Sequence, residues 1–140
     1  MATRDDLGFL LAKASQRWND LVTARFAAAG YPDVRASYGS VLVPLYEEDG
    51  LRMGELARRS RLSKQTITTL VRLAERDGLV VRGPDSADAR AALVSLTPRA
   101  QAFRAVVDET LAELAALVAE GLGADEAVEL KRLLRGVMDL

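Results

Sequence analysis

The sequence contains no cysteine and no histidine. Without thiols the chain can form neither a disulfide framework nor a thiol-based redox switch. Carboxylates alone are poor ligands for zinc and copper, so a transition-metal site is not expected. The usual nucleophile–base pairs of acyl transfer also need His or Cys. We therefore expect no metal, no cofactor and no catalytic site.

Long apolar runs are missing as well. No segment approaches the roughly 20 apolar residues that span a bilayer, and the opening residues MATRDDLG lack the charged and apolar regions of a signal peptide. These absences predict a cytoplasmic protein without a membrane partner. Hydrophobic residues make up 49% and charged residues 28% of the 140 positions, which is typical of one folded domain, residues 1–140.

The segment from Arg52 to Leu96 has the strongest local pattern. Ser63 precedes a run of good helix formers and can cap a helix by accepting a backbone N–H. After it, the apolar residues follow the 3.6-residue period of one helical face: Ile67, Leu70, Val71 and Ala74. Gly78 follows, where helices often end in a left-handed turn.

The other face of this predicted helix is polar and basic, carrying Lys64, Gln65, Thr68, Thr69 and Arg72. Such side chains match base edges and phosphates in a DNA major groove. For an isolated helix, a solvated face is the more common explanation. The preceding short helix offers apolar side chains that can pack on this one, which favours a helix-turn-helix.

A change to two-residue periodicity follows Gly78 and predicts a hairpin. Leu79–Arg82 and Ala92–Leu96 alternate like strands, and the polar Gly83–Arg90 between them is expected to be an irregular tip. Arg90 at this tip could enter a narrow minor groove. The charge agrees, because residues 52–90 carry a net charge of +4 while the whole chain carries −1.

Two stretches resemble the MarR family of transcriptional regulators. They are GELARRSRLSKQTITTLVRLAERDGLVVR and PDSADARAALVSLTPRA, with the wing pattern at Asp88-Ala89-Arg90 and its closing pair at Leu96-Thr97. The chain departs from the family pattern at Arg52, where Thr or Ser usually caps a helix, at Ala89, where an arginine is common, and at Leu73-Ala74. The resemblance also implies a short strand at Leu51.

Helical patterns flank this segment on both sides. A helix is predicted for Asp5–Ala29, and another for Asp33–Tyr46 that Pro44 should bend or end. Thr97-Pro98 is a strong helix start, predicting helices from Pro98 to about Glu120 and from Asp125 to Asp139. The fold class is therefore mainly α with a small β wing: a winged helix-turn-helix flanked by long N- and C-terminal helices.

The terminal helices are unusually apolar for the ends of a small domain, which typically marks an interface. We expect a homodimer, with residues 1–31 and 98–140 as the helical dimerisation region and 33–97 as the winged helix-turn-helix DNA-binding region. An ordinary monomeric bundle is the alternative. Two recognition helices about 34 Å apart would fit successive major grooves of a pseudo-palindrome in double-stranded DNA.

The predicted DNA-binding residues fall into three groups. Gln65, Thr66, Thr68 and Thr69 are assigned to base edges, although Thr66 or Thr68 could instead bond to backbone carbonyls. Phosphate contacts are assigned to Arg58, Arg59, Arg61, Ser63, Lys64 and Arg72. Arg90 is the wing contact, and Asp88 is expected to orient it by a charge-assisted bond or to form a simple exposed ion pair.

The resemblance also implies a small phenolic or carboxylate effector between the helical region and the winged region. Its candidate contacts are Arg17, Trp18, Arg35, Tyr38 and Leu42, for which core packing and surface charge are an equally good explanation. Together these features predict a DNA-binding transcriptional repressor. The alternative functions are a winged-helix protein-interaction module, a metal-sensing repressor, which the lack of Cys and His disfavours, and an enzyme using Glu47, Glu48 and Asp49, which fit a solvated turn better.

Overall fold

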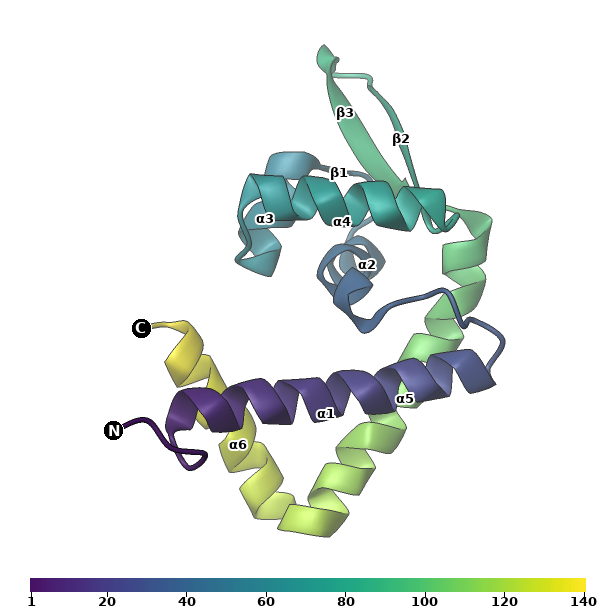
Figure 1. Ribbon diagram of the computed structural model, residues 1–140. Helices are drawn as coiled ribbons and strands as arrows, with labels where there is room; N and C mark the ends of the chain where they lie inside the picture. Colours follow the sequence, from purple (N-terminus) through teal and green to yellow (C-terminus); the bar gives the residue numbers. More distant parts are fainter.

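The computed structural model describes residues 1–140 and divides into a helical base and a winged upper part (Figure 1). The base consists of α1 (Leu7–Ala28), α5 (Pro98–Leu122) and α6 (Ala124–Met138). The upper part consists of the 3₁₀ turn η1 (Ala36–Tyr38), α2 (Gly39–Glu47), β1 (Leu51–Arg52), α3 (Met53–Ser60), α4 (Lys64–Arg76), β2 (Val80–Asp85) and β3 (Asp88–Leu96). The predicted fold class is confirmed. No helix is both long and apolar enough to cross a bilayer.

One hydrophobic core joins the two parts. Phe103 on α5 lies against Phe26 of α1, with ring centroids 4.8 Å apart, and against Tyr31 at 4.6 Å. In the winged part, the large side chains that are fully buried come from the inward-facing positions of the helices and strands and from the connections beside them. These residues include Tyr38, Leu45, Leu56, Ile67, Val71, Leu79 and Val94. The base and the winged part therefore share buried contacts near the start of α5.

The helix-turn-helix forms where the sequence predicted it. Ser63 caps α4 by accepting the Thr66 N–H at 3.1 Å, and Ile67, Val71 and Ala74 are buried, while Leu70 is partly exposed. The turn between α3 and α4 contains Arg61 at φ 55°, a left-handed conformation that non-glycine residues rarely adopt. The Leu62 N–H closes the turn on the Ala57 carbonyl at 3.1 Å.

The three strands form an antiparallel sheet in the order β1-β3-β2, and the strand at Leu51 expected from the resemblance is confirmed. The prediction that Gly83–Arg90 is irregular was wrong, because β2 continues to Asp85 and β3 begins at Asp88. Proline is tolerated at position 84 because β2 is an edge strand, where a missing N–H need not interrupt the sheet. Asp85 accepts the Ala87 N–H at 2.9 Å, which closes a short turn.

The helix predicted for Asp33–Tyr46 is shorter at its start and is not ended by Pro44. The chain makes η1 first, and α2 then runs through Pro44 to Glu47. Proline cannot donate to the carbonyl four residues earlier, which belongs to Ser40. The Ser60 hydroxyl of α3 donates to that carbonyl instead. A tertiary hydrogen bond therefore replaces the helical one.

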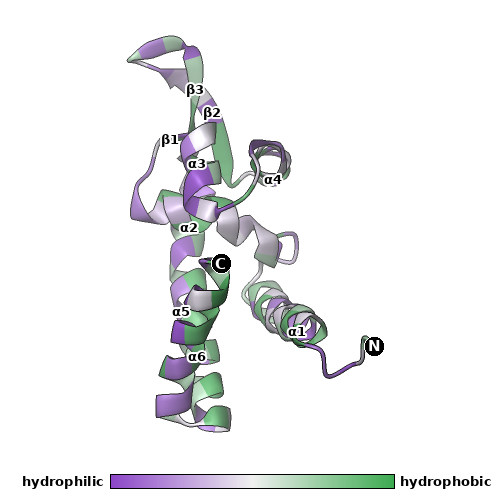
Figure 2. Ribbon diagram, turned by 90° about the vertical axis from the view of Figure 1, so that its left-hand side faces the viewer, coloured by the Kyte–Doolittle hydropathy of each residue, from purple (hydrophilic) through white to green (hydrophobic).

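The terminal helices match their predicted ranges within two residues, but they are far from buried. In α1 only Val22 and Phe26 are buried, and α6 buries no residue at all. Figure 2 shows green, apolar residues along α1, α5 and α6. Large side chains exposed there include Leu7, Leu10, Leu117, Leu122, Val128, Leu133 and Val137.

Replacing Thr97 tests how α5 is attached to the end of α4. The Thr97 hydroxyl accepts the Ala100 N–H at 3.2 Å and donates to the Gly78 carbonyl at 2.6 Å. We expect Thr97→Ala to lower the free energy of unfolding by about 1–3 kcal/mol, through loss of the cap and an unpaired carbonyl. Urea unfolding at fixed protein concentration measures this. Thr97→Ser keeps the hydroxyl and is the control, so equal losses in both variants would contradict the assignment.

Candidate nucleic-acid interface

The exposed face of α4 is the first component of the candidate interface. Lys64, Gln65, Thr69 and Arg72 are exposed, and Thr68 is partly exposed beside them. They lie outward because Ile67, Val71 and Ala74 turn the opposite face of α4 into the core. Lys64 and Arg72 form no ion pair within the protein, so their charges are available to a ligand.

The threonines of this face use their hydroxyl groups locally. Thr68 donates to the Lys64 carbonyl at 2.7 Å and Thr69 to the Gln65 carbonyl at 3.1 Å. Thr66 accepts the Ser63 hydroxyl at 2.8 Å. Thr68 was assigned either to a base edge or to a backbone carbonyl, and its hydroxyl binds a backbone carbonyl here, as does that of Thr69. These side chains therefore offer methyl groups and acceptor lone pairs to a groove, with Gln65 as the amide donor.

Two arginines of α3, assigned to phosphates, are held by carboxylates instead. Arg58 and Arg59 donate to Glu55 at 2.5 and 2.8 Å, and Arg59 also donates to Glu48 at 3.1 Å. The hydrogen bonds from Arg58 and then Arg59 lower the pKa of Glu55 to about 2. Each guanidinium keeps an Nη1 group outside these bonds, so a phosphate would meet a cation whose charge is already partly neutralised.

Arg61 contacts the far end of the chain. Its guanidinium donates to the Met138 carbonyl at 2.9 Å and to Asp139 at 2.8 Å, both at the end of α6. The pair is exposed, so its contribution to stability is small. The sequence offered no signal for this contact, because the partners lie 78 positions apart. Arg61 is thus paired with the end of α6 through Nη1, while its Nε and Nη2 remain unpaired.

The wing is the second component, and it extends beyond α4 at the same end of the molecule (Figure 1). The Arg90 side chain is exposed and forms no ion pair. Asp88 accepts the backbone N–H of Arg90 at 3.0 Å rather than its guanidinium. The expectation that Asp88 orients the Arg90 guanidinium was therefore wrong, and Asp88 shapes the backbone around the tip.

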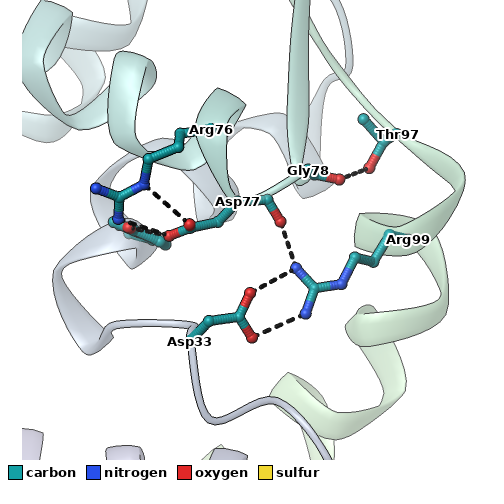
Figure 3. Close-up of polar contacts among 7 residues, drawn as sticks. Asp33, Arg76, Asp77, Gly78, Thr97 and Arg99 are labelled. Atoms are coloured by element: carbon teal, nitrogen blue, oxygen red, sulfur yellow. Dashed lines mark hydrogen bonds and ion pairs between the residues drawn. The ribbon is translucent and has the colours of Figure 1, made fainter.

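A polar junction at the end of α4 sets the position of this helix (Figure 3). Arg99 of α5 donates to Asp33 at 2.9 and 3.1 Å and also to the Asp77 carbonyl. The Asp77 carboxylate accepts the Tyr38 hydroxyl at 2.5 Å and the Arg76 guanidinium at 3.1 Å. The hydrogen bonds from Arg76 and then Tyr38 lower the pKa of Asp77. Burial, followed by the bond to Asp77, raises the pKa of Tyr38.

This junction was missed from the sequence. Its members come from the connection after α1, the end of α4 and the start of α5, and only Tyr38 had been singled out, for another role. Gly78 was noted as a helix stop and does adopt a left-handed φ of 77°. The junction ties the C-terminal end of α4 to the helical base.

A cavity of about 160 Å³ lies between α1, η1–α2 and α5. Trp18, Arg35 and Leu42 line it as expected, together with Phe26, Phe103 and Leu111. Arg17 and Tyr38 do not line it, which corrects the predicted set. Arg17 points elsewhere because adjacent helical residues are about 100° apart, and the buried Tyr38 is directed at Asp77. No cluster of three or more acidic side chains could hold a metal ion.

Comparisons with known proteins agree with this geometry. Residues 33–91 match the model of the MarR family. A probable transcriptional regulator from Pseudomonas aeruginosa is 28% identical, with a TM-score of 0.80 over 95% of this chain and 97% of that one. The PcaV transcriptional regulator from Streptomyces coelicolor, solved with its natural ligand, is 25% identical, with a TM-score of 0.81 over 99% and 98%.

A third solved structure shares the fold at lower identity. The transcriptional repressor CouR, solved on a 23-mer DNA duplex, is 22% identical, with a TM-score of 0.81 over 99% of both chains. A search of curated protein sequences finds no match. The similar solved structures are regulators of transcription rather than enzymes.

Proposed function

We propose that this chain, which belongs to the MarR family of DNA-binding transcriptional regulators, is a repressor that binds a pseudo-palindromic operator as a homodimer. The observation that supports this most directly is the common position of the two exposed elements. α4 and the β2–β3 hairpin lie at the same end of the molecule (Figure 1), and the polar residues of α4 and Arg90 of the hairpin are exposed. A duplex could therefore meet both at once, α4 in the major groove and the wing tip in the neighbouring minor groove.

The contacts divide by chemistry. Gln65 supplies an amide for a base edge, and the methyl groups of Thr68 and Thr69 can meet thymine methyl groups. Lys64 and Arg72 are free cations for phosphates, and the exposed Ser63 and Thr66 hydroxyls lie beside them at the start of α4. Arg58, Arg59 and Arg61 contribute through the N–H groups that their carboxylate or carbonyl partners leave free. CouR, which shares the fold, has been solved on a DNA duplex.

A second copy of the chain accounts for the exposed apolar helices. All fifteen residues of α6 lie outside the core, and Leu133 and Val137, which share one face of the helix, are 52% and 40% exposed. Apolar side chains this continuous on one surface typically mark an interface. The dimer region of residues 1–31 and 98–140 would then place two winged parts, residues 33–97, on one duplex.

The cavity beside Trp18 supports an effector site. A cavity of about 150 Å³ is enough for a benzene ring, and this one measures about 160 Å³. Nine of its twelve lining residues are hydrophobic, and Arg35 supplies a cation for a carboxylate. PcaV, which is 25% identical, has been solved with its natural ligand. A phenolic carboxylate bound here would act by favouring one spacing of the two recognition helices.

Two variants test the DNA face against an operator selected from a random duplex pool. Lys64→Ala should weaken binding to all sequences alike and lower the slope of log K against log salt by about one, because one phosphate contact is lost. Arg90→Ala should weaken operator binding by about 1–3 kcal/mol. Gel-shift titrations measure both, with Lys131→Ala on α6 as the control. If the chain binds no duplex at low salt, the protein-interaction module replaces this proposal.

Sedimentation at micromolar concentration tests the homodimer. The wild type should sediment at about 30 kDa, twice the chain mass of 15.1 kDa. Leu133→Glu should shift it toward the monomer, because a charge on the apolar face of α6 opposes burial. Lys131→Glu changes charge at a polar position of the same helix and should leave the dimer intact. A wild type that sediments only at about 15 kDa would rule out the dimer.

The effector site can be tested by intrinsic fluorescence, because Trp18 is the only tryptophan in the chain. Titration with 4-hydroxybenzoate should change its emission saturably. Arg35→Gln should weaken this binding by about tenfold, as loss of one charged partner does, while Arg17→Gln should not change it. No saturable change, or equal effects of the two variants, would argue against a carboxylate site in this cavity.

A further inference from the structure

Arg52 lies at the base of the wing, yet its side chain contacts the outer end of the hairpin. It is the second and last residue of β1 and precedes α3, where it makes no side-chain cap. Its Nε donates to Asp85 Oδ2 at 2.7 Å, and its Nη2 lies 2.6 Å from the same oxygen in an ion pair. Asp85 is the last residue of β2, 33 positions later in the chain.

The sheet has three strands only as far as Arg52, where β1 ends. Leu51 pairs with Val94 and Arg52 with Leu93, and Leu93 pairs on its other side with Gly83. Between Leu93 and the turn, β2 and β3 pair only with each other. Pro84 there has no N–H for the ladder, and the register becomes irregular between Pro84 and Asp85. A two-stranded hairpin of this kind is marginally stable by itself.

Asp85 connects the ion pair to the wing tip. Its side chain is only 9% exposed, although it lies next to the turn, and Oδ1 accepts the Ala87 N–H at 2.9 Å. One carboxylate therefore closes the turn with one oxygen and binds Arg52 with the other. The bonds from the Ala87 N–H and from Arg52 lower its pKa, which keeps it charged. The chain then passes through Asp88, which orders the backbone of Arg90.

We propose that Arg52 is a positioning residue for DNA binding: through Asp85 it holds the outer wing in the orientation from which Arg90 reaches the duplex. The proposal rests on the proposed DNA-binding function. It assigns a role in DNA binding to Arg52, a residue that does not itself contact DNA. Without Arg52 the outer hairpin would have to become ordered when DNA binds. The entropy lost in that ordering would reduce the affinity that the Arg90 contact contributes.

The prediction is that the effect of Arg90 depends on Arg52. Arg90→Ala should weaken operator binding by about 5- to 150-fold in the wild type. In an Arg52→Met background, which keeps the chain length but removes the donor, the same substitution should cost less than about threefold. Asp85→Asn removes the carboxylate of the ion pair and should also reduce the loss of affinity caused by Arg90→Ala. Arg52→Lys keeps a cation at this position, so Arg90→Ala should regain part of its wild-type effect in that background.

Arg82→Gln is the matched control. Arg82 is also a wing arginine in an ion pair, with Glu75 of α4 at 2.9 Å. It pairs with Val94, at a level where β1 still supports the sheet. In this background Arg90→Ala should therefore keep its cost within about twofold of the wild-type cost. Gel-shift titrations of the wild type, the five single variants and the four double variants with Arg90→Ala, at one salt concentration, give these ratios.

A measurement without DNA separates the two proposals. Since the chain has no cysteine, Ala89→Cys gives one site for a nitroxide label on the exposed tip. Arg52→Met should increase the mobility of this label in its electron paramagnetic resonance spectrum, and Arg82→Gln should not. Unchanged mobility together with an unchanged cost of Arg90→Ala would overturn the role of Arg52. Increased mobility in a chain that binds no duplex would uphold the wing anchor and overturn the DNA-binding function.

Discussion

The position of α4 depends on the polar junction at its C-terminal end. There Arg99 of α5 binds both Asp33 and the Asp77 carbonyl, while Tyr38 binds the Asp77 carboxylate (Figure 3). A buried hydroxyl and a nearly buried carboxylate are costly to leave unpaired, so each holds the other in place. Because α5 also belongs to the helical base, this junction fixes α4, the proposed DNA-reading helix, relative to the proposed dimer region.

The junction also adjoins the cavity. Arg35 and Gly39 line the cavity, and Tyr38 lies between them in sequence while its hydroxyl reaches Asp77. A ligand that moved this turn would therefore also displace the Tyr38 hydroxyl from Asp77 at the end of α4. This arrangement gives the proposed effector a physical connection to the DNA face, and it requires a difference in ligand affinity between two helix spacings.

Carboxylates bind much of the positive charge of the winged part. Arg52, Arg58, Arg59, Arg61, Arg76 and Arg82 all have carboxylate partners. The cations without partners, Lys64, Arg72 and Arg90, lie on the outer face of α4 and at the wing tip. The number of arginines alone overstates the positive charge that a DNA phosphate would meet, because the carboxylate partner offsets much of the charge of a paired arginine. The same pairs stabilise the arrangement that keeps the free cations in place.

The sequence by itself determined the local structure and its order. The apolar period, the Ser63 and Thr97 caps and the Gly78 stop predicted helix bounds within a few residues, because these signals act over one or two turns. They also indicated the family and the polar face of α4. The helix through Pro44 was not predictable in this way, since a Ser60 hydroxyl from α3 satisfies the backbone there. The extended strands of the wing depend on the pairing of β2 with β3, which the polar residues of this segment do not signal.

Only the tertiary structure decided which arginines are paired, which of the five cavity candidates face the cavity, and how the wing is anchored. Arg52 departs from the family pattern at a capping position, and nothing near it in sequence explains the change. Its partner Asp85 becomes a neighbour only when the antiparallel sheet folds. Ion pairs between residues distant in the chain have no local period, because chain folding rather than residue spacing sets the distance between their charges.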